Sequence, residues 1–308
     1  MVSVLLFPGQ GAQKVGMGKD LAEAFPEARD TFLAIDDALG IALSRTMWEG
    51  PAEDLQLTHF TQPAIVAHSA AVLAVVGNKL GQVAGAAGHS LGEYSAYVSA
   101  ASLTPVDAAR LVRLRGELMN QAGQQRPGAM AAVLGLPSAE VERVCREAST
   151  AGEVAVAANL NTPDQTVVSG DPPAVQRAGD ACKAAGAKKV VPIKVSGAFH
   201  SPLMAPAAAG LAEALEATRF EAPAFPVVAN ASATPVTEPR EALRLLREQL
   251  TAPVRWVECV RALALLGPGA RFIEIGPGTV LGGLVKRILP EPEYLSLGTA
   301  VEVQRFLA

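Results

Sequence analysis

The sequence predicts an α/β protein: a large α/β-hydrolase-like domain with a parallel sheet, carrying an inserted ferredoxin-like small subdomain. Three observations support this prediction. The short apolar run Val2–Phe7, ended by a Pro-Gly pair, is typical of a parallel strand that is buried on both faces. A run of small residues leads into Gly-His-Ser-Leu-Gly at 88–92. The segment 129–195 reads as strands and helices in the order βαββαβ.

Length and composition limit the class of protein. The 308 residues fit about two domains, or one large domain with an insert, and 50% of them are hydrophobic, enough for a sizeable core. The 26 basic and 30 acidic residues give a net charge of −4, so no basic excess exists to hold a nucleic acid. The 3 cysteines form no C-x-x-C pair and read as reduced thiols. We expect a cytoplasmic protein with no nucleic acid partner.

Membrane and export signals are not expected. The longest uncharged stretch, Leu55 to Asn78, is interrupted by polar residues and fits a buried core helix better than a membrane span. The apolar run at the N-terminus has no basic residue ahead of it and no cleavage signature. We therefore predict no membrane association.

The elements of the large domain follow from local patterns. After the first strand, a helix covers Gln62–Val76, with Pro63 near its start, and the small residues Val83–Ala87 form a strand. Thr104 followed by proline is typical of a helix start, and Asp107 in the first turn suits the helix dipole. The last strand, turn and helix are residues 271–275, the Gly-Pro-Gly turn at 276–278, and a helix from Thr279 onward.

The middle of the chain has a different periodicity. We expect strands at Ala129–Leu136, Val154–Asn159, Gln165–Gly170 and Lys189–Val195, and helices at Ser138–Ala148 and Pro172–Ala185. We interpret residues 128–195 as the inserted ferredoxin-like subdomain, and residues 1–127 and 196–308 as the large catalytic domain.

The sequence at 88–92 fits the nucleophile-elbow pattern G-x-S-x-G, in which a sharp strand-to-helix turn exposes the serine. Here the serine is Ser90, and the backbone N–H of Leu91 would face an oxyanion. The alternative is a plain turn, because glycine and serine are common in turns. The loop at 9–13 lacks the features of a phosphate loop, and it could offer a second backbone N–H to the oxyanion.

A serine nucleophile needs a base, and the chain has 4 histidines. His89 neighbours Ser90 and should point away from it, and His68 lies in the expected core helix. His200 follows a strand and precedes Ser201, a helix cap, where the helix dipole would lower the pKa of the imidazole and favour the neutral form. Position alone leaves open whether His200 is a base or a packing residue.

Arg115 lies on the apolar face of the helix that starts after Thr104, whereas Arg110 and Arg113 lie on the opposite, solvated face. A buried guanidinium needs a carboxylate partner, from the protein or from a ligand. An internal ion pair with a nearby glutamate and a ligand site both satisfy this requirement.

Ordered motifs along the chain carry a resemblance. They are FPGQGAQ at 7–13, TQPA at 61–64, GHSLGEYSA at 88–96, RG at 115–116, GAMAAVLGL at 128–136, NLNTPDQTVVSG at 159–170, GAFHSPLM at 197–204, PVRW at 253–256 and EIGPGTVL at 274–281. In these motifs, which run over essentially the whole length, the chain resembles the malonyl-CoA:acyl-carrier-protein transacylases, the acyltransferases of fatty acid and polyketide synthesis.

The resemblance implies catalytic roles. Ser90 would be the nucleophile and His200 its base, oriented by a backbone carbonyl near Thr251–Pro253 because no Asp or Glu stands as a third member. The backbone N–H groups of Gln10 and Leu91 would hold the oxyanion.

The resemblance also implies how the substrate is held. Arg115 would pair bidentately with the free carboxylate of the malonyl group, and Gln62 would belong to the polar network around it. Phe199 matches the malonyl-selective members of the family, where pocket volume discriminates against branched acyl groups.

The activity implied is transfer of malonyl from malonyl-CoA to the phosphopantetheine thiol of acyl carrier protein, through a malonyl-serine intermediate. No metal is predicted, since no His, Cys, Asp and Glu cluster has ligand spacing, and no cofactor beyond the substrate's coenzyme A. We expect a monomer that docks the acidic carrier protein on basic residues: Lys183, Lys188, Lys189, Lys194, Lys286 and Arg287. Two alternatives are a serine esterase or thioesterase and a non-catalytic carrier-binding module.

Overall fold

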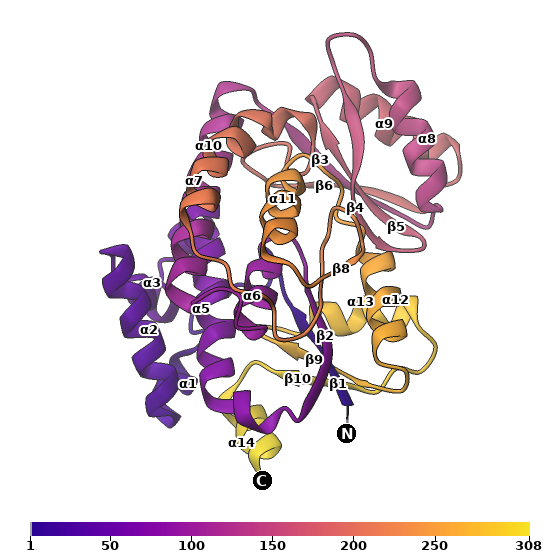
Figure 1. The fold of residues 1–308 in the computed structure, drawn as a ribbon. Helices are drawn as coiled ribbons and strands as arrows, with labels where there is room; N and C mark the ends of the chain where they lie inside the picture. The colour runs from indigo at the N-terminus through magenta and orange to yellow at the C-terminus, as the bar shows by residue number, and fades with distance from the viewer. Residues whose placement is uncertain (1) are drawn as a thin grey trace.

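Two separate sheets organise the protein in a computed structural model that describes residues 2–308 (Figure 1). The larger sheet has the strand order β10-β9-β1-β2-β7-β8, and all neighbours in it are parallel except β7 and β8. Its strands are β1 Val2–Phe7, β2 Gln82–Gly88, β7 Val227–Val228, β8 Pro235–Val236, β9 Arg271–Ile275 and β10 Tyr294–Leu297. The predicted α/β class with a parallel-rich sheet is confirmed.

Helices cover both faces of this sheet (Figure 1). They are α1 Lys19–Ala24, α2 Pro26–Leu39, α3 Leu43–Glu49, α4 Ala52–Gln56, α5 Thr58–Val76, α6 Gly92–Ser99, α7 Pro105–Gln125, α10 Ala205–Ala217, α11 Pro239–Gln249, α12 Trp256–Leu266, α13 Val280–Ile288 and α14 Ala300–Leu307, with short 3-10 turns at Gly77–Lys79 and Pro202–Met204. The side chains of β1 alternate between the two faces of the sheet, and both faces are therefore covered by helices. Leu5 and Phe7 enter the core beneath α5 and α7, whereas Val4 and Leu6 enter the core beneath α12 and α13.

The second sheet is antiparallel, with the order β4-β5-β3-β6, and lies beside the large sheet together with two helices (Figure 1). Its elements are β3 Ala129–Leu134, α8 Ser138–Ala148, β4 Ala155–Thr162, β5 Gln165–Gly170, α9 Pro172–Ala184 and β6 Lys189–Ile193. Strand β4 continues to Thr162, further than predicted, which leaves Pro163 and Asp164 as a tight turn. Strand β6 ends at Ile193 instead of Val195 because its pairing with β3 stops there.

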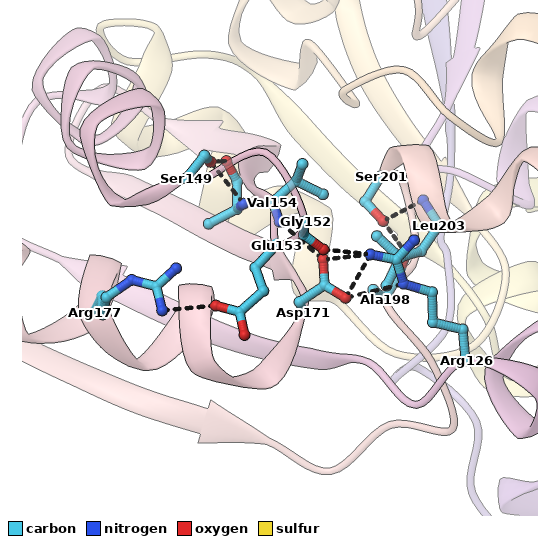
Figure 2. Close-up of polar contacts among 11 residues, drawn as sticks. Arg126, Ser149, Gly152, Glu153, Val154, Asp171, Arg177, Ala198, Ser201 and Leu203 are labelled. Atoms are coloured by element: carbon cyan, nitrogen blue, oxygen red, sulfur yellow. Dashed lines mark hydrogen bonds and ion pairs between the residues drawn. The ribbon is translucent and has the colours of Figure 1, made fainter.

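An ion pair ties the small sheet to the end of α7 (Figure 2). Arg126, the residue that caps α7, donates from Nε to Asp171 Oδ1 at 2.9 Å and from Nη2 to Oδ2 at 2.9 Å. Asp171 Oδ2 also accepts from the backbone N–H of Val154 at 2.8 Å. Arg126, at the end of α7, is therefore held by Asp171 to the neighbouring ends of β4 and β5 in the small sheet.

Helix α5 is the buried core helix expected from its composition. Its stretch Thr58–Lys79 is long and apolar enough to cross a membrane, yet 72% of the most apolar 18 residues in it lie buried within the protein. Pro63 lies inside α5, so it cannot donate to the carbonyl of His59 one turn earlier.

Arg113 supplies that missing hydrogen bond, donating from Nη1 to His59 O at 3.0 Å while its guanidinium lies 4.7 Å from the Phe60 ring centre. The expectation that Arg113 is solvated was therefore wrong. Only 23% of its side chain is exposed, because α5 and α7 pack closely at this point.

Candidate active site

The turn after β2 has the geometry of a nucleophile elbow. Gly88 ends β2 beside Phe7 of β1, α6 begins at Gly92, and Ser90 between them has φ 53°, in the left-handed region. A Cβ on Gly88 would lie 1.9 Å from the carbonyl carbon of Gly92. A Cβ on Gly92 would lie 2.3 Å from the carbonyl oxygen of Phe7. Both glycines are thus required by close backbone approach, which allows the turn to present Ser90.

Replacing Gly92 with alanine should lower the free energy of unfolding by about 3 kcal/mol, because the new methyl group meets backbone atoms of β1 that cannot move aside. Thermal unfolding would measure the loss. Gly283→Ala in α13 is the matched control, since a Cβ there meets nothing within 4 Å and alanine favours the helix. Equal melting temperatures for the two variants would contradict the packing argument.

The loop after β6 brings His200 to Ser90. Ser90 Oγ lies 2.7 Å from His200 Nε2, and His200 Nδ1 lies 2.9 Å from the backbone carbonyl of Gln249. A carbonyl only accepts, so Nδ1 carries the proton, and Nε2 is left free to accept from the serine. The orienting carbonyl belongs to Gln249, the last residue of α11. The expected segment Thr251–Pro253 lies just beyond it.

Burial lowers the pKa of His200 to about 3, and the positive charge of Arg115 acts in the same direction. The neutral form expected from the sequence therefore has a different cause from the helix dipole proposed there. Only 4% of His200 is exposed, and the helical segment that follows it begins with a short 3-10 turn, Pro202–Met204.

Arg115 is 1% exposed and reaches the serine from α7. It donates from Nη1 to Gln62 Oε1 at 2.7 Å, and from Nη2 to Ser90 Oγ at 3.1 Å and Gln249 Oε1 at 3.0 Å. All three acceptors are uncharged groups, so Arg115 makes no ion pair among residues 2–308. Of the two alternatives left by the sequence, the internal ion pair is thus not the one formed.

A chain of hydrogen bonds links Arg115 to the first loop. Beyond Gln62, the amide Nε2 donates to Thr58 Oγ1 at 2.9 Å, and Thr58 Oγ1 donates to Gln10 Oε1 at 2.9 Å. Within the described chain, the backbone N–H groups of Gln10 and Leu91 have no protein acceptor. These are the two N–H groups that the sequence assigns to an oxyanion.

Phe199 is 7% exposed in the core beside His200. His89 points away from Ser90, with Nε2 2.9 Å from Asn161 Oδ1 on β4 and its ring 5.4 Å from that of Trp256. His68 is buried within α5, and burial lowers its pKa to about 4. Over residues 2–308, no group of three His, Cys, Asp or Glu side chains could hold a metal ion.

Sequence reasoning missed three buried residues of the site. Asn230 Oδ1 accepts from the backbone N–H of Ser90 at 2.7 Å, and its Nδ2 donates to Gly88 O at 2.7 Å. Gln249 and Glu93 are both fully buried, and Gln249 Nε2 donates to Glu93 Oε2 at 2.7 Å. Glu93 carried a signal, a charge within a helix of small and aromatic residues, but a first-turn acid is equally typical of a helix surface.

Together these groups can perform acyl transfer. An activated hydroxyl, a neutral imidazole held in the right tautomer and two free backbone N–H groups are the parts of a serine acyl-enzyme mechanism. The buried cation beside the hydroxyl favours an acyl group that itself carries a negative charge.

The chain is similar to known acyltransferases over nearly all of its length. The family described as "Acyl transferase domain" matches residues 4–301. The malonyl CoA-acyl carrier protein transacylase of Bacillus subtilis (strain 168) is 45% identical over 283 residues, 92% of this chain and 89% of the relative. The protein of the same name from Escherichia coli (strain K12) is 44% identical, covering 92% of both chains.

Solved structures show the same likeness. A malonyl-transacylase in complex with a type II PKS acyl-carrier protein superimposes with a TM-score of 0.95 at 42% identity, covering 100% of this chain and 99% of the other. An acyl carrier protein S-malonyltransferase from Vibrio cholerae gives a TM-score of 0.93 at 42% identity, covering 98% of both chains.

Proposed function

Because this chain belongs to the acyl transferase family and, within it, to the malonyl CoA-acyl carrier protein transacylases, we propose that it transfers malonyl from malonyl-CoA to the phosphopantetheine thiol of acyl carrier protein. The observation that carries the proposal is Arg115. It is a buried cation that makes no ion pair among residues 2–308, and it is hydrogen-bonded to the hydroxyl of Ser90. The malonyl carboxylate would give Arg115 a direct ion-pair partner.

The catalytic cycle has two matching halves. His200 Nε2 takes the Ser90 proton as Ser90 Oγ bonds to the thioester carbon, and the oxyanion is held by the N–H groups of Gln10 and Leu91. The C–S bond then breaks, and His200 returns the proton to the leaving thiolate of coenzyme A. The phosphopantetheine thiol, deprotonated by the same His200, attacks the malonyl ester, and Ser90 recovers its proton.

Arg115 holds the acyl group during both halves. A guanidinium has five N–H donors, and three of them are used, by Gln62, Gln249 and the Ser90 hydroxyl. Acylation converts the Ser90 hydroxyl to an ester, so the Nη2 hydrogen that Ser90 accepted becomes free. That donor and the spare Nη1 hydrogen give a fork for a bidentate carboxylate. Phe199, buried next to His200, limits the volume left for the acyl chain.

Mass spectrometry after incubation with malonyl-CoA tests the proposal. We expect a malonyl adduct on the peptide that contains Ser90, and its loss when holo acyl carrier protein is added, with the malonyl group gained by the carrier. Release of free malonate without carrier would identify the esterase or thioesterase alternative. Absence of any adduct would favour a binding module.

We take residues 128–195 as the inserted ferredoxin-like subdomain, since they have their own sheet and apolar core, and residues 1–127 and 196–308 as the hydrolase-like domain.

The chemistry requires no metal or cofactor beyond the coenzyme A and phosphopantetheine of its substrates. We place a monomer in the cytoplasm. Among the basic docking candidates, Arg287 donates to Asp164 Oδ1 at 2.5 Å and to Gln165 Oε1 at 3.0 Å, and Lys183 donates to Asp180 Oδ1 at 3.2 Å.

A further inference from the structure

A buried carboxylate that the catalytic cycle does not use is linked to Ser90 through Gln249. Glu93, in the first turn of α6, is 0% exposed. Its Oε2 accepts from the backbone N–H of Asn230 at 2.9 Å and from Gln249 Nε2 at 2.7 Å. Its Oε1 has no hydrogen-bond partner among the described residues. Burying a carboxylate costs free energy unless nearby groups form hydrogen bonds to it or balance its charge.

Gln249 is the neighbour that connects Glu93 to the reacting groups. Both hydrogens of its Nε2 are donated, one to Glu93 and one to the backbone carbonyl of Ser90 at 3.0 Å. Its Oε1 must therefore face Arg115, from which it accepts at 3.0 Å. With Glu93 as a pure acceptor, the opposite orientation of the amide would set Nε2 hydrogens against the guanidinium.

The negative charge of Glu93 also affects Arg115. Arg115 makes no ion pair, and Glu93 is a carboxylate separated from it by the one amide group of Gln249. An ionised Glu93 therefore balances the guanidinium through a polarised amide while the site holds no acyl group. A malonyl carboxylate on Arg115 brings a second negative charge into the same low-dielectric region.

We propose that Glu93 is a positioning residue for malonyl transfer, which fixes the amide of Gln249 toward Arg115 and balances its charge until the acyl carboxylate arrives, when Glu93 takes up a proton. This inference rests on the proposed function. It predicts that proton uptake accompanies malonyl acylation and does not accompany acetyl acylation, because an acetyl group brings no charge.

The surroundings of Glu93 place its titration in an accessible range. Burial raises the pKa of Glu93 to about 7, against the lowering effect of its hydrogen bonds and of Arg115. The other titratable groups that face it are Cys259 on α12 and Tyr94 and Tyr97 on its own helix, and burial raises the pKa of each. These three stay neutral and Arg115 stays charged near neutral pH, so Glu93 is the group in this cluster that titrates there.

Below its pKa, Glu93 is neutral and Arg115 is an unbalanced cation that binds a carboxylate strongly. Above it, the ionised Glu93 weakens that binding. The ratio of kcat/KM for malonyl-CoA to that for acetyl-CoA should fall about tenfold from about pH 6 to about pH 8. Taking the ratio cancels the titration of coenzyme A and of any group that both substrates need.

The experiment compares this ratio in the unaltered protein and in Glu93→Gln. The variant should give a ratio that is constant with pH and equal to the low-pH value of the unaltered protein. Glu274→Gln is the matched control, because Glu274 is another fully buried carboxylate whose partners are Tyr294 and the N-terminus of α13. That variant should keep the slope even if it loses stability.

A constant ratio in the unaltered protein, or an unchanged slope in Glu93→Gln, would overturn the inference. If Glu93→Gln does not fold, proton uptake by the unaltered protein decides, measured by calorimetry of acylation in buffers of different ionisation enthalpy near pH 7. Uptake with malonyl-CoA alone supports the inference, and equal uptake with both substrates overturns it. Failure of the unaltered protein to transfer malonyl at all would instead refute the proposed function.

Discussion

Replacing Ser90 with alanine is expected to lower malonyl transfer by about 10⁶-fold, because Ser90 Oγ, hydrogen-bonded to His200, is the proposed nucleophile of the acyl-enzyme ester. Turnover would be measured as malonyl gained by holo acyl carrier protein in a mass spectrum. His200→Ala should cost about as much, since Ser90 then has no base. The double variant should be no worse than either single one, because nucleophile and base act as a unit.

Ser95 provides the control for this prediction. It lies on α6, the helix that follows Ser90, is 1% exposed, and its Oγ has no hydrogen-bond partner in the described chain. Ser95→Ala removes a comparable hydroxyl without touching Ser90 or His200, and transfer should be unchanged. A Ser90→Ala protein that still forms a malonyl adduct elsewhere would contradict the assignment of the nucleophile.

Replacing Arg115 with alanine is expected to change which acyl group is transferred. The malonyl carboxylate would be buried without a counter-charge, which costs about 3–5 kcal/mol, so kcat/KM for malonyl-CoA should fall by about a thousandfold. An acetyl group carries no charge and should still be transferred. Loss of the positive charge also removes one cause of the low pKa of His200, which favours its action as a base. Parallel assays with the two coenzyme A thioesters would measure the ratio.

Arg113 is the matched control for Arg115. It is two residues away on α7, and its guanidinium hydrogen-bonds to His59 and packs on Phe60, away from Ser90. Arg113→Ala should reduce stability and leave the malonyl-to-acetyl ratio unchanged. Equal loss of malonyl and acetyl transfer in Arg115→Ala would contradict the role of Arg115 as carboxylate ligand.

The parts of the fold that could be predicted depend on local patterns. Thr104 accepts from the backbone N–H of Asp107 at 3.0 Å, as the cap residue followed by proline indicates. The order of elements through the small sheet could be read from alternating apolar periods. The end of β6 could not, because Val195 has the same strand preference as Val190 and Val191, whereas the pairing with β3 ends at Met130 and Ile193.

The site was predictable where a residue violates its local pattern. Arg115 on an apolar helix face had to be buried, but its partners come from α5 and α11, 53 and 134 residues away, and no local pattern names them. Gln249 ends an amphipathic helix and gives no sign that its carbonyl holds His200. Asn230 lies 140 residues from Ser90. Such contacts arise from the crossing of segments in space, which a single sequence does not encode in any local period.

On the proposed mechanism, Arg115 binds the carboxylate of the acyl group that Ser90 carries. A crystal structure of the malonylated protein tests it most directly. The two carboxylate oxygens should lie about 2.8 Å from Nη1 and Nη2 of Arg115, with the ester carbonyl directed at the N–H groups of Gln10 and Leu91. A malonyl carboxylate that points to solvent, with Arg115 still bonded only to Gln62 and Gln249, would contradict the account.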